Sequence, residues 1–294
     1  MQAMARLTRI PAVVALVLGA LVVAGCDGGG EEAGRVDTTP TPTSTSTSTS
    51  TDGTTTPAQS SVAVYFLRDG KVSPVRRTVA ATPAVARAAI TALLQGPTEE
   101  ESTDGLSSAI PEGTELRDIA LSDGVATVDL GGSFDDGGGS ASMLGRVAQV
   151  VATLTRFPSV ERVAFRVDGE PVETIGGEGV VVDPPLGRAA IEDETPQILV
   201  ESPLPGDTVT SPVRLRGTAN VFEATVSIDV RDAGGKLLKR TFTTATSGNG
   251  TRGTFDTTVA LPGHEGVVTV VAYEASAKDG TPLHVVRVPL VLSG

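Results

Sequence analysis

Apolar residues recur along the chain after residue 60 with two different periods. Between residues 61 and 182, strand-like alternation is interrupted twice by apolar residues spaced three and four apart. That spacing places the apolar side chains on one face of a helix, where they can be buried together. The two stripes consist of Ala86, Ile90, Leu93 and Leu94, and of Met143, Val147, Val150, Leu154 and Phe157. The pattern therefore predicts two amphipathic helices within this stretch.

The first predicted helix has clear boundary signals. Thr82 is expected to cap it, Pro83 suits its first position, and Gly96-Pro97 ends it. The second predicted helix ends before Pro158.

Five stretches with strand character surround these helices, and the Asp-Gly pair at 123–124 predicts a hairpin turn. They cover 62–67, 72–79, 115–121, 125–130 and 162–167. The order of strands and helices is that of a split βαβ layer. We expect residues 61–182 to form a two-layer α/β domain, with both helices on one face of a small mixed sheet.

The remainder of the chain shows strand patterns without any helical stripe. Residues 183–195, with two prolines and an acidic run, are predicted to be a linker. Residues 196–294 contain about seven short strand-like runs separated by Gly-rich turns, which is typical of an immunoglobulin-like sandwich. The Cys–Trp–Cys core of antibody domains is missing, since the chain has no Trp. The predicted fold class is α+β, a split βαβ domain followed by an all-β immunoglobulin-like sandwich.

The N-terminal segment has the parts of a secretory signal peptide. Arg6 and Arg9 precede an uncharged run at 10–25, which is 16 residues long and contains Pro11. A membrane-spanning helix needs roughly 20 apolar residues, so the run is short for a transmembrane anchor. We therefore predict that residues 1–25 are removed as a signal peptide. An anchor helix and an ordinary secreted protein are the alternatives.

Cys26, the single cysteine, follows the small residues Val23-Ala24-Gly25 at the predicted cleavage site. This ending resembles the bacterial lipobox, which implies a diacylglyceryl group, with palmitate-type chains, on the Cys26 thiol. Two acyl chains hold a protein firmly on a membrane. Residues 26–60 continue as a Thr-, Ser- and Pro-rich stalk without apolar periodicity, predicted to be disordered. The expected location is the extracytoplasmic face of the cell membrane.

The charge balance excludes one class of partner. The net charge is −12, and it becomes −14 when residues 1–25 are removed, because these carry two arginines and no acidic residue. An acidic chain without basic clusters lacks the electrostatic footprint of a nucleic-acid-binding protein. The lone cysteine also excludes a disulfide within the chain, so stability is expected to come from aliphatic cores.

Residues that could carry chemistry are few. His264-Glu265 lacks the second histidine of a zinc-protease motif, and His284 is expected on a strand surface. The Gly-rich loop 131–140 contains Asp135 and Asp136, which favour a cation over phosphate, although their spacing matches no Ca²⁺ loop. A plain flexible loop is the expected reading. We predict no catalytic residue, no metal site and no cofactor.

Glu223 is an acidic residue within a strand-like run of the second domain. It could contact a partner or accept hydrogen bonds from neighbouring turns, and the structural role is the favoured reading.

Residues 61–182 resemble the GerMN domain of spore-germination and sporulation lipoproteins. The matching motifs are Val64-Tyr65-Phe66-Leu67, Leu93-Leu94-Gln95-Gly96-Pro97-Thr98, Ile110-Pro111-Glu112-Gly113-Thr114, Val125-Ala126-Thr127-Val128-Asp129-Leu130 and Val167-Asp168-Gly169. The second domain resembles the immunoglobulin-like domain that often follows GerMN. It carries Ser202-Pro203-Leu204-Pro205-Gly206, Gly217-Thr218-Ala219-Asn220 and Gly253-Thr254-Phe255.

The resemblance implies a non-catalytic lipoprotein that acts as a scaffold or adaptor in envelope complexes. It implies binding to an envelope protein or self-association, through surfaces that the sequence leaves unknown. The alternative is a lipoprotein that binds wall glycan or a solute. That alternative calls for a pocket with aromatic side chains, and the chain has only Tyr65 and Tyr273 besides seven phenylalanines.

Overall fold

The computed structural model describes residues 58–177 and 179–294. The predicted signal peptide, Cys26 and all but the last residues of the predicted stalk lie outside the described residues. Among the described helices, none combines the length and the apolar character needed to cross a membrane.

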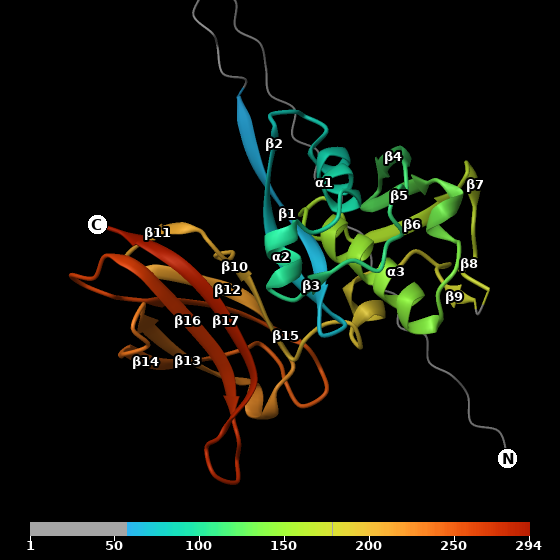
Figure 1. Cartoon of the computed structure of the whole chain (residues 1–294). Coiled ribbons are helices and arrows are strands. Elements are labelled where there is room, and N and C mark those ends of the chain that lie inside the picture. The colour runs from blue at the N-terminus through green and yellow to red at the C-terminus, as the bar shows by residue number, and fades with distance from the viewer. Residues whose placement is uncertain (1–57, 178) are drawn as a thin grey trace, which may run out of the picture. The chain divides into compact units, whose positions relative to one another are not determined.

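The first region is an α+β module built from two main helices and three small sheets (Figure 1). Its strands are β1 (Gln59–Arg68), β2 (Lys71–Ala80), β3 (Leu106–Ser107), β4 (Leu116–Ser122), β5 (Val125–Leu130), β6 (Arg162–Val167), β7 (Glu170–Pro171), β8 (Thr174–Ile175) and β9 (Val180–Val181). Its helices are α1 (Val85–Leu94), α2 (Glu99–Thr103) and α3 (Ser140–Leu154), with 3₁₀ turns η1 (Gly132–Phe134) and η2 (Arg188–Ile191).

The predicted split βαβ order is present, because α3 connects the parallel strands β5 and β6. The strands do not form the single mixed sheet that the pattern suggested. One sheet has the order β2-β1-β3, a second has the order β4-β5-β6-β7, and β8 and β9 form a separate two-stranded sheet. The fold class is confirmed, and the expectation of one continuous sheet is wrong.

Buried polar side chains of α3 explain why β1 has no strand partner along part of one edge. The backbone N–H of Tyr65 donates to Thr153 Oγ1 (3.1 Å), and Gln149 Nε2 donates to the Tyr65 carbonyl (3.3 Å). Gln149 and Thr153 are completely buried. A buried backbone group without a partner is costly, and here the helix supplies the partner that a neighbouring strand would otherwise supply. The predicted stripe of α3 is buried beside them, with Met143, Val147, Val150 and Leu154 all in the core.

Two predicted boundaries shift in the structure. Helix α1 begins at Val85 with Ala84 at its N-cap, so Thr82 is not the cap. Thr82 Oγ1 instead accepts a hydrogen bond from the Ala84 N–H within the preceding turn. Strand β1 begins at Gln59, before the predicted start of order at Ser61, because the ladder with β2 extends to the Gln59–Ala80 pair.

The second region is a two-sheet β-sandwich, as predicted. Its elements are β10 (Ile198–Ser202), β11 (Thr208–Thr210), β12 (Val213–Ala219), η3 (Phe222–Ala224), β13 (Thr225–Asp232), β14 (Leu237–Thr244), β15 (Gly253–Val259), β16 (Gly266–Ala275) and β17 (Pro282–Ser293). The order is β10-β12-β15 in one sheet and β11-β17-β16-β13-β14 in the other. Aliphatic side chains fill the space between the sheets, with Phe255 the one buried aromatic residue of this core cluster.

The segment predicted as a linker is partly packed in the structure. Within it, η2 spans Arg188–Ile191, and the Ile191 side chain is buried in the core of the first region. Leu199 of β10 is buried in the same core. The two regions are therefore joined by buried side chains as well as by the chain itself.

Candidate functional site

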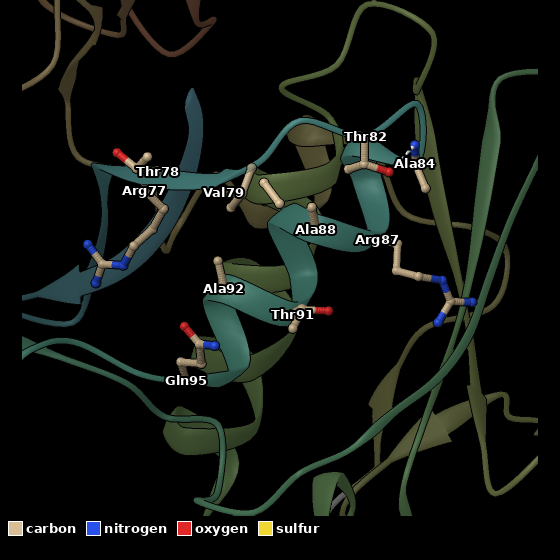
Figure 2. Close-up of a pocket in the computed structure, with 11 residues that line it drawn as sticks. Arg77, Thr78, Val79, Thr82, Ala84, Arg87, Ala88, Thr91, Ala92 and Gln95 are labelled. Carbon is tan, nitrogen blue, oxygen red and sulfur yellow. Dashed lines mark hydrogen bonds between the residues drawn. The ribbon is translucent and has the colours of Figure 1, made fainter. Parts of the chain in front are cut away.

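A groove lies between strand β2 and helix α1 (Figure 2). Its volume is about 410 Å³. Its walls are mostly small side chains from the two elements and the turn between them. They are Arg77, Thr78, Val79, Ala80, Thr82, Ala84, Arg87, Ala88, Thr91, Ala92 and Gln95. The groove is apolar at its floor and has no aromatic residue in its lining.

The outer edge of β2 faces away from β1. Strand β2 lies at the end of its sheet and pairs only with β1. The Val72 N–H points outward, since it donates to the Glu194 carbonyl (2.8 Å) rather than to β1. The direction of the backbone N–H and C=O groups alternates along a strand. The backbone groups of Pro74, Arg76 and Thr78 therefore also point away from β1.

This alternation divides the β2 edge into a protected half and an open half. Pro74 lacks an N–H, and prolines and charged side chains are common devices that prevent unwanted edge pairing. Thr78 and Ala80 carry no such protection. Among the described residues, their outward backbone groups form no hydrogen bond. The open half of the edge coincides with the groove wall.

The charged residues of the groove are already paired. Arg77 forms a bidentate ion pair with Glu101, with both nitrogen–oxygen distances at 2.6 Å, and its guanidinium lies 5.0 Å from the centre of the Phe66 ring. The hydrogen bond from Arg77 holds the pKa of the Glu101 carboxyl below its usual range. Arg87 pairs with Asp118 at 2.5 Å. Figure 2 shows the two arginines on opposite sides of helix α1, and the other residues that line the groove carry no charge.

Helix α2 fixes Glu101 in this position. Thr98 Oγ1 accepts from the Glu101 N–H, and Glu101 Oε2 accepts from the Thr98 N–H (2.8 Å), which forms a capping box. The same carboxylate therefore caps a helix and holds Arg77 at the groove.

A second polar cluster lies around the buried Tyr65. Its hydroxyl donates to Glu201 Oε1 (2.8 Å), and Arg188 Nη2 lies 3.1 Å from the same oxygen. The Arg188 guanidinium stacks over the Tyr65 ring, 5.1 Å from its centre. Burial raises the pKa of the Tyr65 hydroxyl well above its ordinary value, and the Glu201 charge raises it further. This hydroxyl is therefore a permanent donor, suited to structure and not to proton transfer.

The histidines singled out from the sequence are not brought together with other ligands. His264 lies in an exposed turn, and its Nδ1 is 3.1 Å from the Pro262 carbonyl. His284 lies on the surface of β17, with Nε2 3.7 Å from Glu274 Oε2. Across the described part of the chain, no three His, Cys, Asp or Glu residues are grouped to hold a metal ion.

The Gly-rich loop at 131–140 is built around an arginine that the sequence reasoning missed. The buried Arg146 of α3 donates to the carbonyls of Phe134, Asp136 and Gly137, at 2.7, 2.9 and 3.0 Å. Asp135 Oδ1 accepts from the Gly176 N–H. The Arg146 guanidinium already occupies the position in front of these carbonyls, so a metal cation is disfavoured there.

Glu223 lies in η3 with positive φ, followed by Ala224 in the same left-handed region. Its N–H donates to Asn249 Oδ1 (3.0 Å), and its carbonyl accepts from the Thr225 hydroxyl. The backbone of Glu223 thus takes part in a turn network, while its side chain is exposed.

The arrangement defines an α+β module joined to an immunoglobulin-like sandwich, with a groove between β2 and α1. Residues 63–173 match the family model Germane, described as sporulation and spore germination. Residues 197–281 match Gmad2, the immunoglobulin-like domain of bacterial spore germination. The chain therefore contains a Germane domain followed by a Gmad2 domain.

Solved structures that match parts of the chain include GerMN domains. The first GerMN domain of the sporulation protein GerM from Bacillus subtilis is 22% identical over 44% of this chain and 98% of its own, with a TM-score of 0.37. The tandem GerMN domains of the same protein are 15% identical, over 69% of this chain and 62% of their own, with a TM-score of 0.40. A Clostridium perfringens chain provisionally named a lipoprotein is 23% identical over 45% of this chain and 89% of its own, with a TM-score of 0.34. No curated protein matches the chain.

Proposed function

We propose that the protein is a lipid-anchored adaptor on the extracytoplasmic face of the cell membrane. In this proposal the Germane domain binds an extended segment of another envelope protein along the open half of the β2 edge. The observation that carries the proposal is the coincidence of that edge with the groove against α1. Both matched families concern sporulation and spore germination, and neither description names a reaction.

The groove favours a particular kind of partner segment. A strand that pairs with a free edge gains main-chain hydrogen bonds, and pockets beside the edge select its alternate side chains. Outward backbone groups are available at Thr78 and Ala80, and the facing helix presents Ala88 and Thr91. The segment that fits is therefore extended, with small apolar or β-branched side chains directed at α1. Since Arg77 and Arg87 already have carboxylate partners, the segment needs no acidic residue.

A photo-crosslinking residue at position 91, inside the groove, tests this proposal in intact cells. We expect it to capture a protein partner. The same reagent at position 170, on the exposed strand β7, serves as the control and is expected not to capture that partner. Capture of wall glycan alone from position 91 would contradict the adaptor and favour the glycan-binding alternative. Capture of only a second copy of this chain would replace the heterologous partner with self-association.

The anchoring part of the proposal rests on Cys26, which lies outside the described residues. Replacement of Cys26 by Ala removes the thiol that would carry the lipid. We expect the variant to be released from the membrane fraction or to remain unprocessed. A variant that is processed and held on the membrane like the parent chain would show that Cys26 is not the anchor.

A further inference from the structure

We propose that a second cavity, at the junction of the Germane and Gmad2 domains, binds a small oxyanion such as phosphate or a short carboxylate. The cavity has a volume of about 180 Å³. Arginine and threonine side chains dominate its lining, with Arg156 and Arg188 from the first domain and Thr218 and Arg252 from the second. Nothing in the proposed adaptor function requires this site.

The positive charges around this cavity exceed the negative ones. Arg188 pairs with Glu201 (3.1 Å), and Arg252 pairs with Glu192 (2.7 Å). Arg156 forms no ion pair with any residue that the structure describes. One guanidinium of the three therefore lacks a counter-charge.

The hydrogen-bond donors of Arg156 are also incompletely satisfied. Its Nε is buried and has no acceptor among the described residues. Its one hydrogen bond runs from Nη2 to the Glu201 backbone carbonyl, at a long 3.4 Å. A buried donor without an acceptor is destabilising, and more so when the group is charged. An oxyanion in the cavity would accept from the Arg156 guanidinium, which lines it, and would supply the missing charge.

A second donor is available on the other wall. Thr218 Oγ1 accepts from Arg252 Nη1 (3.3 Å), which leaves its hydroxyl hydrogen free to donate. Thr155 differs, because its hydroxyl already donates to the Val151 carbonyl (2.6 Å). The donors available to an anion in the cavity are thus the Arg156 guanidinium and the Thr218 hydroxyl.

The Glu201 carboxylate does not oppose an anion strongly. Its Oε1 already accepts from the Tyr65 hydroxyl and faces Arg188. The Glu201 charge is thus paired within the cluster, which leaves Arg156 as the unpaired charge among the described residues that line the cavity.

The size of the cavity limits the ligand. Pockets for drug-sized ligands usually measure about 300–1,000 Å³. A cavity of about 180 Å³ holds phosphate or a short carboxylate and excludes a nucleotide or a disaccharide. Because the donors come from both domains, the bound anion would also tie the two domains together.

Titration of the purified full chain with inorganic phosphate, followed by calorimetry at constant ionic strength in chloride, tests this inference. We expect one saturable site per chain, with acetate as a second probe that separates phosphate from carboxylate. The Arg156→Gln variant should bind phosphate at least tenfold more weakly, since it loses a charge-assisted hydrogen bond. Arg156→Lys keeps the charge and loses the planar guanidinium, so its affinity for phosphate should lie between that of the parent chain and that of Arg156→Gln.

The matched control is Arg214→Gln, which removes an equal charge from an exposed ion pair on β12. It should bind phosphate like the parent chain. Circular dichroism of each variant separates loss of binding from loss of fold. Absence of saturable binding to either probe in the folded parent chain, or equal weakening in the Arg156 and Arg214 variants, would overturn the proposed site.

Discussion

Replacement of Arg146 by Met should destabilise the Germane domain by about 3 kcal/mol, because this side chain holds the Gly-rich loop against α3. Arg146 is only 4% exposed. Besides its bonds to the loop, its Nε donates to the Ala109 carbonyl (2.9 Å). Methionine keeps most of the apolar stem and removes all the donors, so the variant isolates the hydrogen bonds from the packing.

The magnitude follows from which acceptors water can reach after the change. Phe134 is buried and Ala109 is half-buried, whereas Asp136 and Gly137 are exposed. Water can therefore replace the guanidinium at the two exposed carbonyls and not at the other two. A hydrogen bond to a charged group contributes about 1.5–3 kcal/mol, so two of them give about 3–6 kcal/mol. Burial lowers the pKa of the Arg146 guanidinium, which reflects a desolvation cost that the variant no longer carries. The lower end of the range is thus expected.

Urea denaturation followed by circular dichroism measures this change, and hydrogen exchange over residues 131–139 shows where protection is lost. Arg87→Met is the control, since it removes an exposed ion pair with an expected effect below about 1 kcal/mol. If Arg146→Met unfolds within about 1 kcal/mol of the parent chain, the four hydrogen bonds do not hold the loop as argued.

Two further predictions concern the Gmad2 domain. Hydrogen bonding from Arg240 lowers the pKa of Asp229, so the ion pair stabilises the fold above the ordinary pKa of an aspartate and is lost as the pH falls through the lowered value. Acid unfolding of Asp229→Asn should therefore show a weaker dependence on pH below about 4 than the parent chain. Gly217→Ala should destabilise the sandwich by about 1–3 kcal/mol or more in thermal unfolding. An added Cβ would lie 2.1 Å from the Leu199 carbonyl oxygen and 2.7 Å from the Phe255 ring. Unchanged stability would show that the strands separate more easily than this packing implies.

The regular elements were predictable because their signals are local. Apolar spacing located α1 and α3, and alternation with turn residues located the strands of both domains. The short helix α2 was missed because five residues cannot show an apolar stripe, although Thr98 and Glu101 carry the capping-box spacing. The division of the first sheet in two was not predictable, since it depends on Gln149 and Thr153 reaching the β1 backbone from a distant helix.

The candidate sites depend on contacts between residues far apart in the sequence. Tyr65 and Glu201 are separated by 136 positions, and no local pattern connects them. Arg156 is an ordinary arginine in the sequence. Only the burial of its Nε without an acceptor distinguishes it in the structure. The sequence gives a partial indication of the free β2 edge, because a proline within a strand, here Pro74, indicates an edge strand. The residues that sequence reasoning singled out, such as His264 and Asp135, form hydrogen bonds within turns and loops.

The central claim, that a partner segment pairs with the open half of the β2 edge, is tested most directly at Thr78. Its N–H points away from β1, so Thr78→Pro removes an outward donor without removing a bond between β1 and β2, as Pro74 already does in the same strand. Thr78→Ala, the matched control, keeps the N–H and removes only the side chain. Capture of the protein partner by the residue 91 crosslinker should persist in Thr78→Ala and disappear in a folded Thr78→Pro. Equal capture by both variants would contradict strand pairing at this edge.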